Sequence, residues 1–254
     1  MANPNPHYGT GTFRRRVRVR AAPGQVTVEL EDGNHGFRLR MWHDGARINT
    51  VELDPLRIPF NTCAEASKPL TRAIGHRLDE GAAVLRDRLV PSDNCTHMHD
   101  MLVLAAAHAA SHRGEEATTR QYDMAVEDER SGVMRASVRC NGETVHEWEI
   151  AKHEIVAPAE LAGRPAMRGF HAWASECFAD LRLEAAVALQ RAYFVAQSRR
   201  FSFEPAALNP GVADGMPHSA CYSYNRSVVE RALRSDGTVR DFTHTPDLLL
   251  KFLP

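Results

Sequence analysis

Hydrophobic and polar residues alternate with the period of a β-strand early in the chain. The segments "VTVELED" (26–32) and "GFRLRMW" (36–42) put apolar side chains at every second position, as a half-buried strand requires. The residues "HDGA" (43–46) then separate "FRLRMW" from "RINTVEL", and the Asp-Gly pair within them is typical of a tight hairpin. The pattern therefore predicts at least three antiparallel strands.

A helical region follows these strands. A proline-rich connection, "DPLRIPFN", leads to "CAEASKPLTRAIGHRLDEGAAVLRDRL", which has helical character but is interrupted around Pro69 and Gly75. Pro91 stops this stretch, and "SDNCTHMHD" then opens a second helix that continues as "DMLVLAAAHAASHR". The first half thus reads as strands, a hairpin, a proline-bearing link and a long helix.

The same order of elements recurs in the second half. "YDMAVED", "VMRASVRCNGETVHEWEI", "HEIVAPAELAGRPAMRGFHAW" and "FADLRLEAAVALQRAYFVAQSRR" again read as strand, hairpin, proline-bearing link and long helix. The hairpin glycines Gly45 and Gly142 lie 97 positions apart, and the same offset places Leu53 on Ile150. We interpret the pattern as a degenerate internal repeat; the alternative is two similar units that arose by chance.

The predicted fold class is α+β, with two degenerate repeats of antiparallel strands followed by long helices. A duplicated unit would pack about a pseudo-twofold axis, and the cleft between its halves is a common place for a small-molecule site. The predicted organisation is a flexible N-terminus (1–13), a first repeat (14–113), a second repeat (114–200) and a C-terminal arm (201–254).

The C-terminal arm differs in character from the repeats. "FEPAALNPGVADGMPHSACYSYNRS" is rich in Pro, Gly, Ser and aromatic residues and has no clear period, and a segment of this kind is usually a functional loop or an arm. We expect residues 205–226 to cover the site, with Tyr222 and Tyr224 lining a substrate pocket or reaching a neighbouring subunit. Packing of both tyrosines on their own domain is the alternative.

Composition and charge restrict the class of protein. A net charge of -1 and a pI near 6.9 provide no general field for nucleic acid. No apolar run approaches the ~20 residues that cross a bilayer, and the first residues lack the apolar core of a signal peptide, so we expect a cytoplasmic protein. The single basic run alternates with valine as an edge strand would; it comprises Arg14, Arg15, Arg16, Arg18 and Arg20.

The cysteines and the missing motifs narrow the chemistry further. Five cysteines, an odd number with no CxxC pair, predict reduced thiols in a chain of this size. The sequence has no GxGxxG, GxxxxGK[ST] or GxSxG motif, which disfavours nicotinamide, flavin and ATP chemistry. We therefore expect no cofactor.

The segment "CTHMHD" (95–100) concentrates titratable side chains at a helix start. In a continuous helix His97 and His99 differ by about 200° and point to opposite sides. His97, Met101, Leu104 and His108 would share one stripe, and Cys95, His99 and Leu102 another. A single metal ion could take both histidines only if residues 95–99 stayed a loop, with a third ligand such as His35 or Asp32.

Acid-base chemistry suits this position better than metal binding. The positive end of the helix dipole favours a neutral His97, which is a competent general base near neutral pH. The free N–H groups of the first turn would stabilise an anion developing on the substrate. Cys95 is a second candidate, as a nucleophile whose thiol pKa the dipole lowers. A purely structural role, with Cys95 in the core and His97 bonded to a backbone carbonyl, is the alternative.

The first half of the chain also resembles a known family. "HGFRLRMWHDGARINTVELDPLRIPFNTC", "PLTRAIG" and "NCTHMHDML" are similar to bacterial domain-of-unknown-function family 2889, over roughly residues 14 to 112. Cys95, Thr96 and His97 form the most specific part of the motif, and His35 and Cys63 support it, whereas His99 lies beyond it. The resemblance implies a shared fold and site and a place in the bacterial breakdown of small aromatic or other organic compounds.

From these patterns we expect a homodimeric, cofactor-independent lyase or isomerase that acts on a small organic substrate by His-mediated proton transfer. A metal-dependent hydrolase or lyase using His97, His99 and His35 is one alternative, and a non-catalytic small-molecule binding protein is another. The expected catalytic residues are His97, Cys95, His99, Asp100 and His35, and the expected substrate-binding residues are Thr96, Arg38, Tyr222 and Tyr224, with no bound metal.

Overall fold

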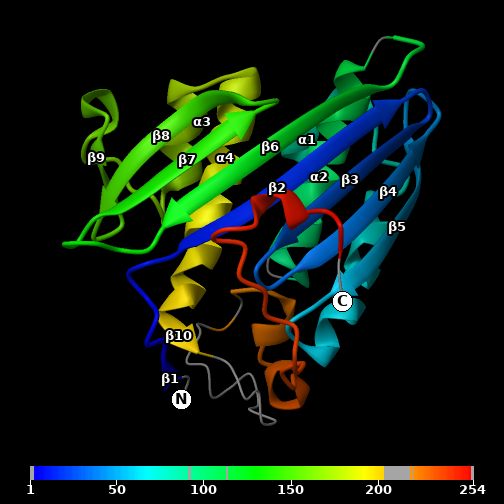
Figure 1. Ribbon diagram of the computed structural model, residues 1–254. Coiled ribbons are helices and arrows are strands. Elements are labelled where there is room, and N and C mark those ends of the chain that lie inside the picture. The colour runs from blue at the N-terminus through cyan, green and yellow to red at the C-terminus, as the bar shows by residue number, and fades with distance from the viewer. Residues whose placement is uncertain (1–2, 91–92, 113, 203–217, 219, 253–254) are drawn as a thin grey trace.

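One eight-stranded antiparallel sheet runs through both halves of the chain, and the long helices pack on one of its faces (Figure 1). The structure is a computed structural model that describes residues 3–90, 93–112, 114–202, 218 and 220–252. The strand order is β5-β4-β3-β2-β6-β7-β8-β9. This arrangement confirms the α+β class, because the strands of each half follow one another along the chain and form an antiparallel sheet, and the helices come after them.

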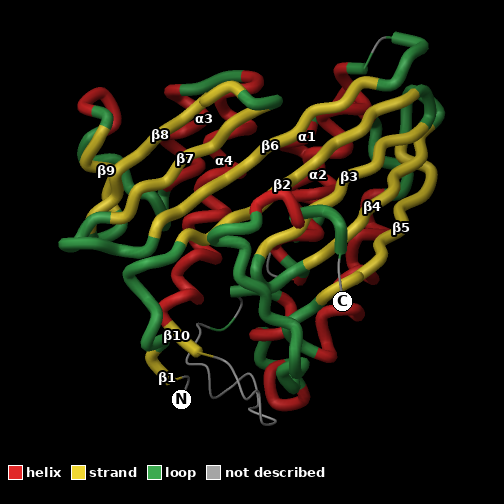
Figure 2. Tube along the Cα trace, viewed as in Figure 1, coloured by secondary structure: helices red, strands yellow, loops and turns green. Residues whose placement is uncertain are grey.

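Each half contributes four consecutive strands and then helices (Figure 2). The first half contains β2 (Thr12–Ala22), β3 (Gln25–Asp32), β4 (Gly36–His43), β5 (Ile48–Arg57), 3-10 helices at Asn61–Ala73 and Leu78–Glu80, α1 (Ala82–Arg88) and α2 (Thr96–Ser111). The second contains β6 (Thr118–Glu127), β7 (Met134–Cys140), β8 (Glu143–Ala151), β9 (Glu154–Ala157), α3 (Phe170–Cys177) and α4 (Asp180–Ala196). Outside the sheet, β1 (Asn3–Pro4) pairs with β10 (Phe201–Ser202).

The strand order is symmetric about the β2–β6 pair. This ladder runs from Thr12 opposite Glu127 to Ala21 opposite Thr118 and joins the two halves. Helix α2 packs on β2, β3 and β4, and α4 packs on β6, β7 and β8. The two long helices therefore lie side by side over the centre of the sheet.

The 97-residue offset of the hairpin glycines does not match this symmetry. Gly45 lies between the third and fourth strands of its half, whereas Gly142 lies between the second and third strands of its own. Both turns need a glycine at positive φ, 90° at Gly45 and 91° at Gly142, as any tight hairpin of this kind does. The shared turn chemistry therefore identifies a hairpin but not its place in the sheet.

The arginine-rich strand β2 is central, not an edge strand as its pattern indicated. It pairs with β3 on one side and β6 on the other. On the face away from the helices, Arg16 forms an ion pair with Asp123 at 2.5 Å and Arg18 donates to Gln121. Cross-strand partners of this kind allow a charged face in the middle of a sheet.

The C-terminal segment crosses the outer face of the sheet, in front of β2 in Figure 1. The backbone N–H of Arg240 donates to the carbonyl of Gly33, and that of Leu250 to Glu31. Of the segment 205–226, which we expected to cover the site, residues 205–217 and 219 lie outside the described part of the chain.

Two further expectations concern the membrane and the cysteines. None of the helices in the described ranges combines the length and the apolar character that crossing a membrane needs. All five cysteines are free thiols, and those of Cys63, Cys95 and Cys140 are buried.

Candidate functional site

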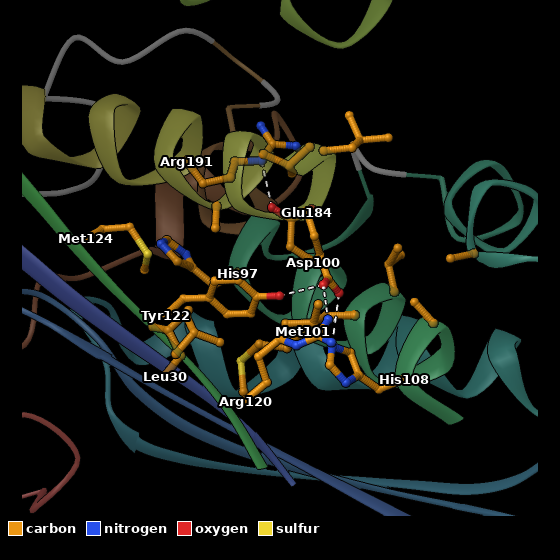
Figure 3. Close-up of a pocket in the computed structure, with 18 of the residues that line it drawn as sticks. Leu30, His97, Asp100, Met101, His108, Arg120, Tyr122, Met124, Glu184 and Arg191 are labelled. Atoms are coloured by element: carbon orange, nitrogen blue, oxygen red, sulfur yellow. Dashed lines mark hydrogen bonds and ion pairs between the residues drawn. The ribbon is translucent and has the colours of Figure 1, made fainter. Parts of the chain in front are cut away.

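A cavity of about 490 Å³ lies between α2, α4 and the central strands, a size typical of small-molecule sites. Figure 3 shows the side chains around it. Strands β2, β3 and β6 provide the floor, and the two long helices provide the walls. Its lining is largely apolar and includes Val17, Leu30, Met101, Leu104, Met124 and Val187.

The predicted stripe on α2 faces this cavity. His97, Met101, Leu104 and His108 all line it. Helix α2 is continuous from Thr96, so His99 points away, and its imidazole lies against the Asp100 carboxylate and the Arg86 carbonyl. The prediction that the two histidines serve different surroundings is confirmed.

His97 is buried and held in its neutral form. Its Nε2 lies 2.8 Å from an Arg15 guanidinium nitrogen, which can only donate, so Nε2 is the acceptor. The ring proton then sits on Nδ1, which faces the Cys95 Sγ at 3.7 Å. Burial, together with the nearby His35 and Arg15, lowers the pKa of His97 well below its usual value, and the imidazole is uncharged at neutral pH.

A buried ion pair holds Arg15 in place. Arg15 and Asp32 are directly opposite one another in the β2–β3 ladder, and their side chains meet at 2.6 Å with 2% and 0% exposure. Asp32 also accepts hydrogen bonds from the Asn34 and His35 backbone N–H groups and lies 3.0 Å from the His35 ring nitrogen. Burial opposes ionisation, but His35 and Arg15 hold the pKa of Asp32 well below its usual value.

His35 and His97 were expected at the site from the sequence, whereas Arg15 was not, and Asp32 was expected only as an alternative metal ligand. A signal was present in the strand period. Phe13, Val17 and Val19 are buried at every second position of β2, and Arg15 falls in the same phase. An arginine in phase with core residues predicts a buried charge that needs a partner.

The side chains of Asp32, His35 and His97 converge, with possible ligand atoms within 4.8 Å of one another. His99 does not belong to this group, because α2 is already helical at that position. A cation already lies among these atoms: one guanidinium nitrogen of Arg15 is 2.6 Å from the Asp32 carboxylate and 2.8 Å from the His97 Nε2. A metal ion would have to displace Arg15, so the donor set does not fit a metal in this arrangement.

A second polar cluster occupies the other end of the cavity and centres on Glu184. Its carboxylate accepts hydrogen bonds from Tyr122 at 2.5 Å and Arg120 at 3.0 Å, and it lies 3.0 Å from the His108 Nε2. Burial opposes ionisation, but these partners, His108 first, lower the pKa of Glu184. No pattern in the sequence linked Glu184 to these three partners.

Asp100 and Glu184 occupy equivalent positions, since each is the fifth residue of its helix. Each forms a bond to the opposite helix: Asp100 pairs with Arg191 at 2.6 Å, and Glu184 meets His108. Helices α2 and α4 therefore run antiparallel, with one ionic bridge near each end of the cavity. Burial opposes ionisation of Asp100, but Arg191 and His99 hold its pKa well below the usual value.

Cys95 lies behind His97 and not on the cavity wall. It is the N-cap residue of α2 and 5% exposed. Burial raises the pKa of its thiol well above the ordinary value, because desolvation outweighs the helix dipole. Cys95 is therefore a neutral thiol at neutral pH, which removes the basis of its expected role as a nucleophile.

The other predicted substrate contacts divide between the cavity and the outside. Thr96 lines the cavity. The Tyr222 hydroxyl donates to Glu65, and Tyr224 packs edge-on against Phe60, both away from the cavity. Arg38 pairs with Glu29 and lies over the Phe252 ring, on the face of the sheet opposite the helices.

Acidification from pH 7 to pH 5 is expected to lower the free energy of unfolding by about 1 kcal/mol or more. Burial lowers the pKa of His171 to about 4 and also depresses those of His97 and His146. Unfolded histidines bind protons near pH ~6.5, so protons favour the unfolded state from there down to the folded pKa. Urea denaturation at both pH values measures the change.

His171→Phe provides the control for this prediction. Within the described residues the His171 Nε2 is buried with no hydrogen-bond partner, so an apolar ring fits there. The variant is expected to lose less stability on acidification than the wild type does. Equal stability of the wild type at pH 5 and pH 7 would contradict the prediction.

Comparison with known proteins gives a family match over part of the chain and no activity. Residues 14–111 match the family model described as "Protein of unknown function (DUF2889)". The matched region contains Arg15, Asp32, His35 and His97, and it ends with α2. No curated protein matches the chain.

Proposed function

The family model that residues 14–111 match has no known function, and we propose from the site geometry that the protein is a lyase or isomerase that needs no cofactor. It moves a proton on a small organic substrate bound between α2 and α4. One observation carries the proposal: His97 is a neutral imidazole on the cavity wall, and its Nε2 faces Arg15, which also lines the cavity.

The proposed chemistry follows from the hydrogen bond that Arg15 donates to the lone pair of the His97 Nε2. A substrate oxygen that accepts a hydrogen bond from Arg15 replaces His97 as the acceptor and frees Nε2. Nε2 then takes the proton from the adjacent carbon, and the electron pair moves onto the oxygen beside the guanidinium, where positive charge stabilises it. An isomerase returns the proton to another carbon, whereas a lyase expels a leaving group.

Asp32 and Cys95 position these two groups. Asp32 fixes the Arg15 guanidinium in the cavity wall, and the Cys95 sulfur faces the protonated Nδ1 of His97. A fixed tautomer is necessary because only the free lone pair can act as a base. Asp32 and Cys95 therefore orient Arg15 and His97 without contacting the substrate.

Chelators are expected to leave the activity unchanged, since Arg15 supplies the positive charge among Asp32, His35 and His97. Metal analysis of the purified protein before and after treatment with EDTA measures the metal content, and turnover is followed in parallel. Stoichiometric zinc, iron or manganese that is lost together with activity would replace this proposal with a metal-dependent one.

Proton transfer can be tested before the substrate is known. The protein is incubated in D₂O with a panel of unsaturated and aromatic carboxylic acids and their neutral amides, and NMR follows loss of C–H signals and formation of products. A base that takes a proton from carbon exchanges it with solvent, so deuterium incorporation is the expected result. Binding of panel members without exchange or turnover would indicate a non-catalytic binding protein.

A further inference from the structure

One of the four arginines that line the cavity has no carboxylate partner among the described residues. Three of the lining arginines have carboxylate partners: Arg15 with Asp32, Arg120 with Glu184, and Arg191 with Asp100. The fourth lining arginine is Arg86 on α1. Among the residues that the structure describes, its guanidinium has no ion pair or hydrogen bond.

Arg86 lies at the His97 end of the cavity. Its backbone carbonyl accepts from the His99 ring, next to Asp100 near the start of α2. Asp180 is the lining carboxylate without an ion pair in the described part of the chain, and it belongs to the other end: it is exposed, opens α4, and precedes Glu184 by one turn. From Asp180 to Arg191, α4 rises ~16 Å, so the unpaired cation and the unpaired carboxylate lie at opposite ends.

We infer that the cavity binds an elongated, largely apolar carboxylate whose acid group lies at Arg86. The inference rests on the proposed function only in placing the substrate in the same cavity. A guanidinium on a mostly apolar wall favours one charged group on an otherwise apolar ligand. The single spare positive charge matches a carboxylate better than a phosphate, which carries a charge nearer -2.

The position of the acid group agrees with the chemistry at His97. Arg86, Thr96 and His97 line the same end of the cavity, so a carboxylate at Arg86 brings the carbons next to it towards Arg15 and the His97 Nε2. The apolar remainder of the ligand extends past Met101 and Leu104. Its far end reaches Tyr122 and Glu184, which can accept a hydrogen bond from a terminal hydroxyl group.

Acids and their neutral isosteres provide the test. Decanoate and trans-cinnamate, each compared with its primary amide, are titrated into the wild type, Arg86→Gln and Arg88→Gln by calorimetry. The wild type is expected to bind at least one acid ~10-fold or more tightly than its amide, in line with a charge-assisted bond. Arg86→Gln is expected to lose this preference. Arg88, exposed on the same helix and outside the cavity wall, should be replaceable without effect.

A cavity-filling variant locates the bound acid. Leu104→Trp fills the middle of the cavity and is expected to abolish binding of the acids while the protein remains folded by circular dichroism. Equal affinity for acids and amides, an undiminished preference in Arg86→Gln, or unchanged binding in Leu104→Trp would each overturn the inference. Proton exchange on the neutral amides alone would support the proposed function and contradict this inference. Selective binding of acids without exchange would support this inference and contradict the proposed function.

Discussion

Asp32→Ala is expected to lower the free energy of unfolding by about 3–5 kcal/mol, since it leaves the Arg15 charge buried without its partner. Arg15 and Asp32 are almost completely excluded from solvent, so water cannot replace the lost carboxylate. The substitution also removes the acceptor for the backbone N–H groups of Asn34 and His35 in the β3–β4 turn. Urea denaturation of the wild type and the variant measures the difference.

Asp54→Ala is the matched control. Asp54 forms an ion pair with Arg40 at 2.7 Å, again between neighbouring strands, but both side chains are partly exposed. Its removal is expected to cost about 1 kcal/mol or less. The double variant Arg15→Met/Asp32→Leu should recover most of the stability lost in Asp32→Ala, because no uncompensated charge remains. A loss in Asp32→Ala no larger than that in Asp54→Ala would contradict a stabilising role for the buried pair.

The strand period predicted local structure well and the arrangement of the strands poorly. The alternation in 26–32 and 36–42 corresponds to β3 and β4, because the faces of a strand are determined by residues two apart. Whether β2 lies at an edge or in the centre depends on β6, whose residues follow their β2 partners by between 97 (Ala21 to Thr118) and 115 (Thr12 to Glu127) positions in the chain. A charged face is compatible with either position when cross-strand partners such as Asp123 are present, so the arginine run was misinterpreted.

The helical period located half of the site. It placed His97, Met101, Leu104 and His108 on one stripe, and that stripe lines the cavity. It could not supply the opposite wall, because the β2–β6 ladder that joins the two halves brings α4 beside α2. The sequence pattern therefore did not link Arg191 or Glu184 to α2. The only indication for Arg15 was its position in phase with the buried residues of β2.

Burial changes the chemistry that helix dipoles alone would predict. The helix start was expected to lower the thiol pKa of Cys95 and to favour a neutral His97. Desolvation dominates at both residues: it raises the pKa of Cys95 and lowers that of His97. A buried helix start thus disfavours the thiolate and favours the neutral imidazole, and of the two candidates only His97 retains a form suited to catalysis.

His97→Gln is expected to reduce the rate of turnover, or of solvent deuterium incorporation, by ~10²-fold or more on any acid that the wild type converts. The glutamine side-chain oxygen can still accept the hydrogen bond from Arg15, so folding and binding of the acid should be retained. Turnover by the wild type is expected to fall only as the pH drops through the lowered pKa of His97, and to be level above about pH 7. Rates over a pH series and binding measured by calorimetry test both parts.

His99→Gln is the control for this last prediction, because it changes the other histidine of the same helix turn. His99 is buried against the Arg86 carbonyl and Asp100 and does not line the cavity, so its replacement should affect stability more than turnover per folded molecule. Circular dichroism establishes the folded fraction of each variant. Near-normal turnover in His97→Gln with loss of turnover in His99→Gln would show that the assignment of proton transfer to His97 is wrong. Loss of turnover in both variants together with loss of a bound metal would favour a metal site over a general base.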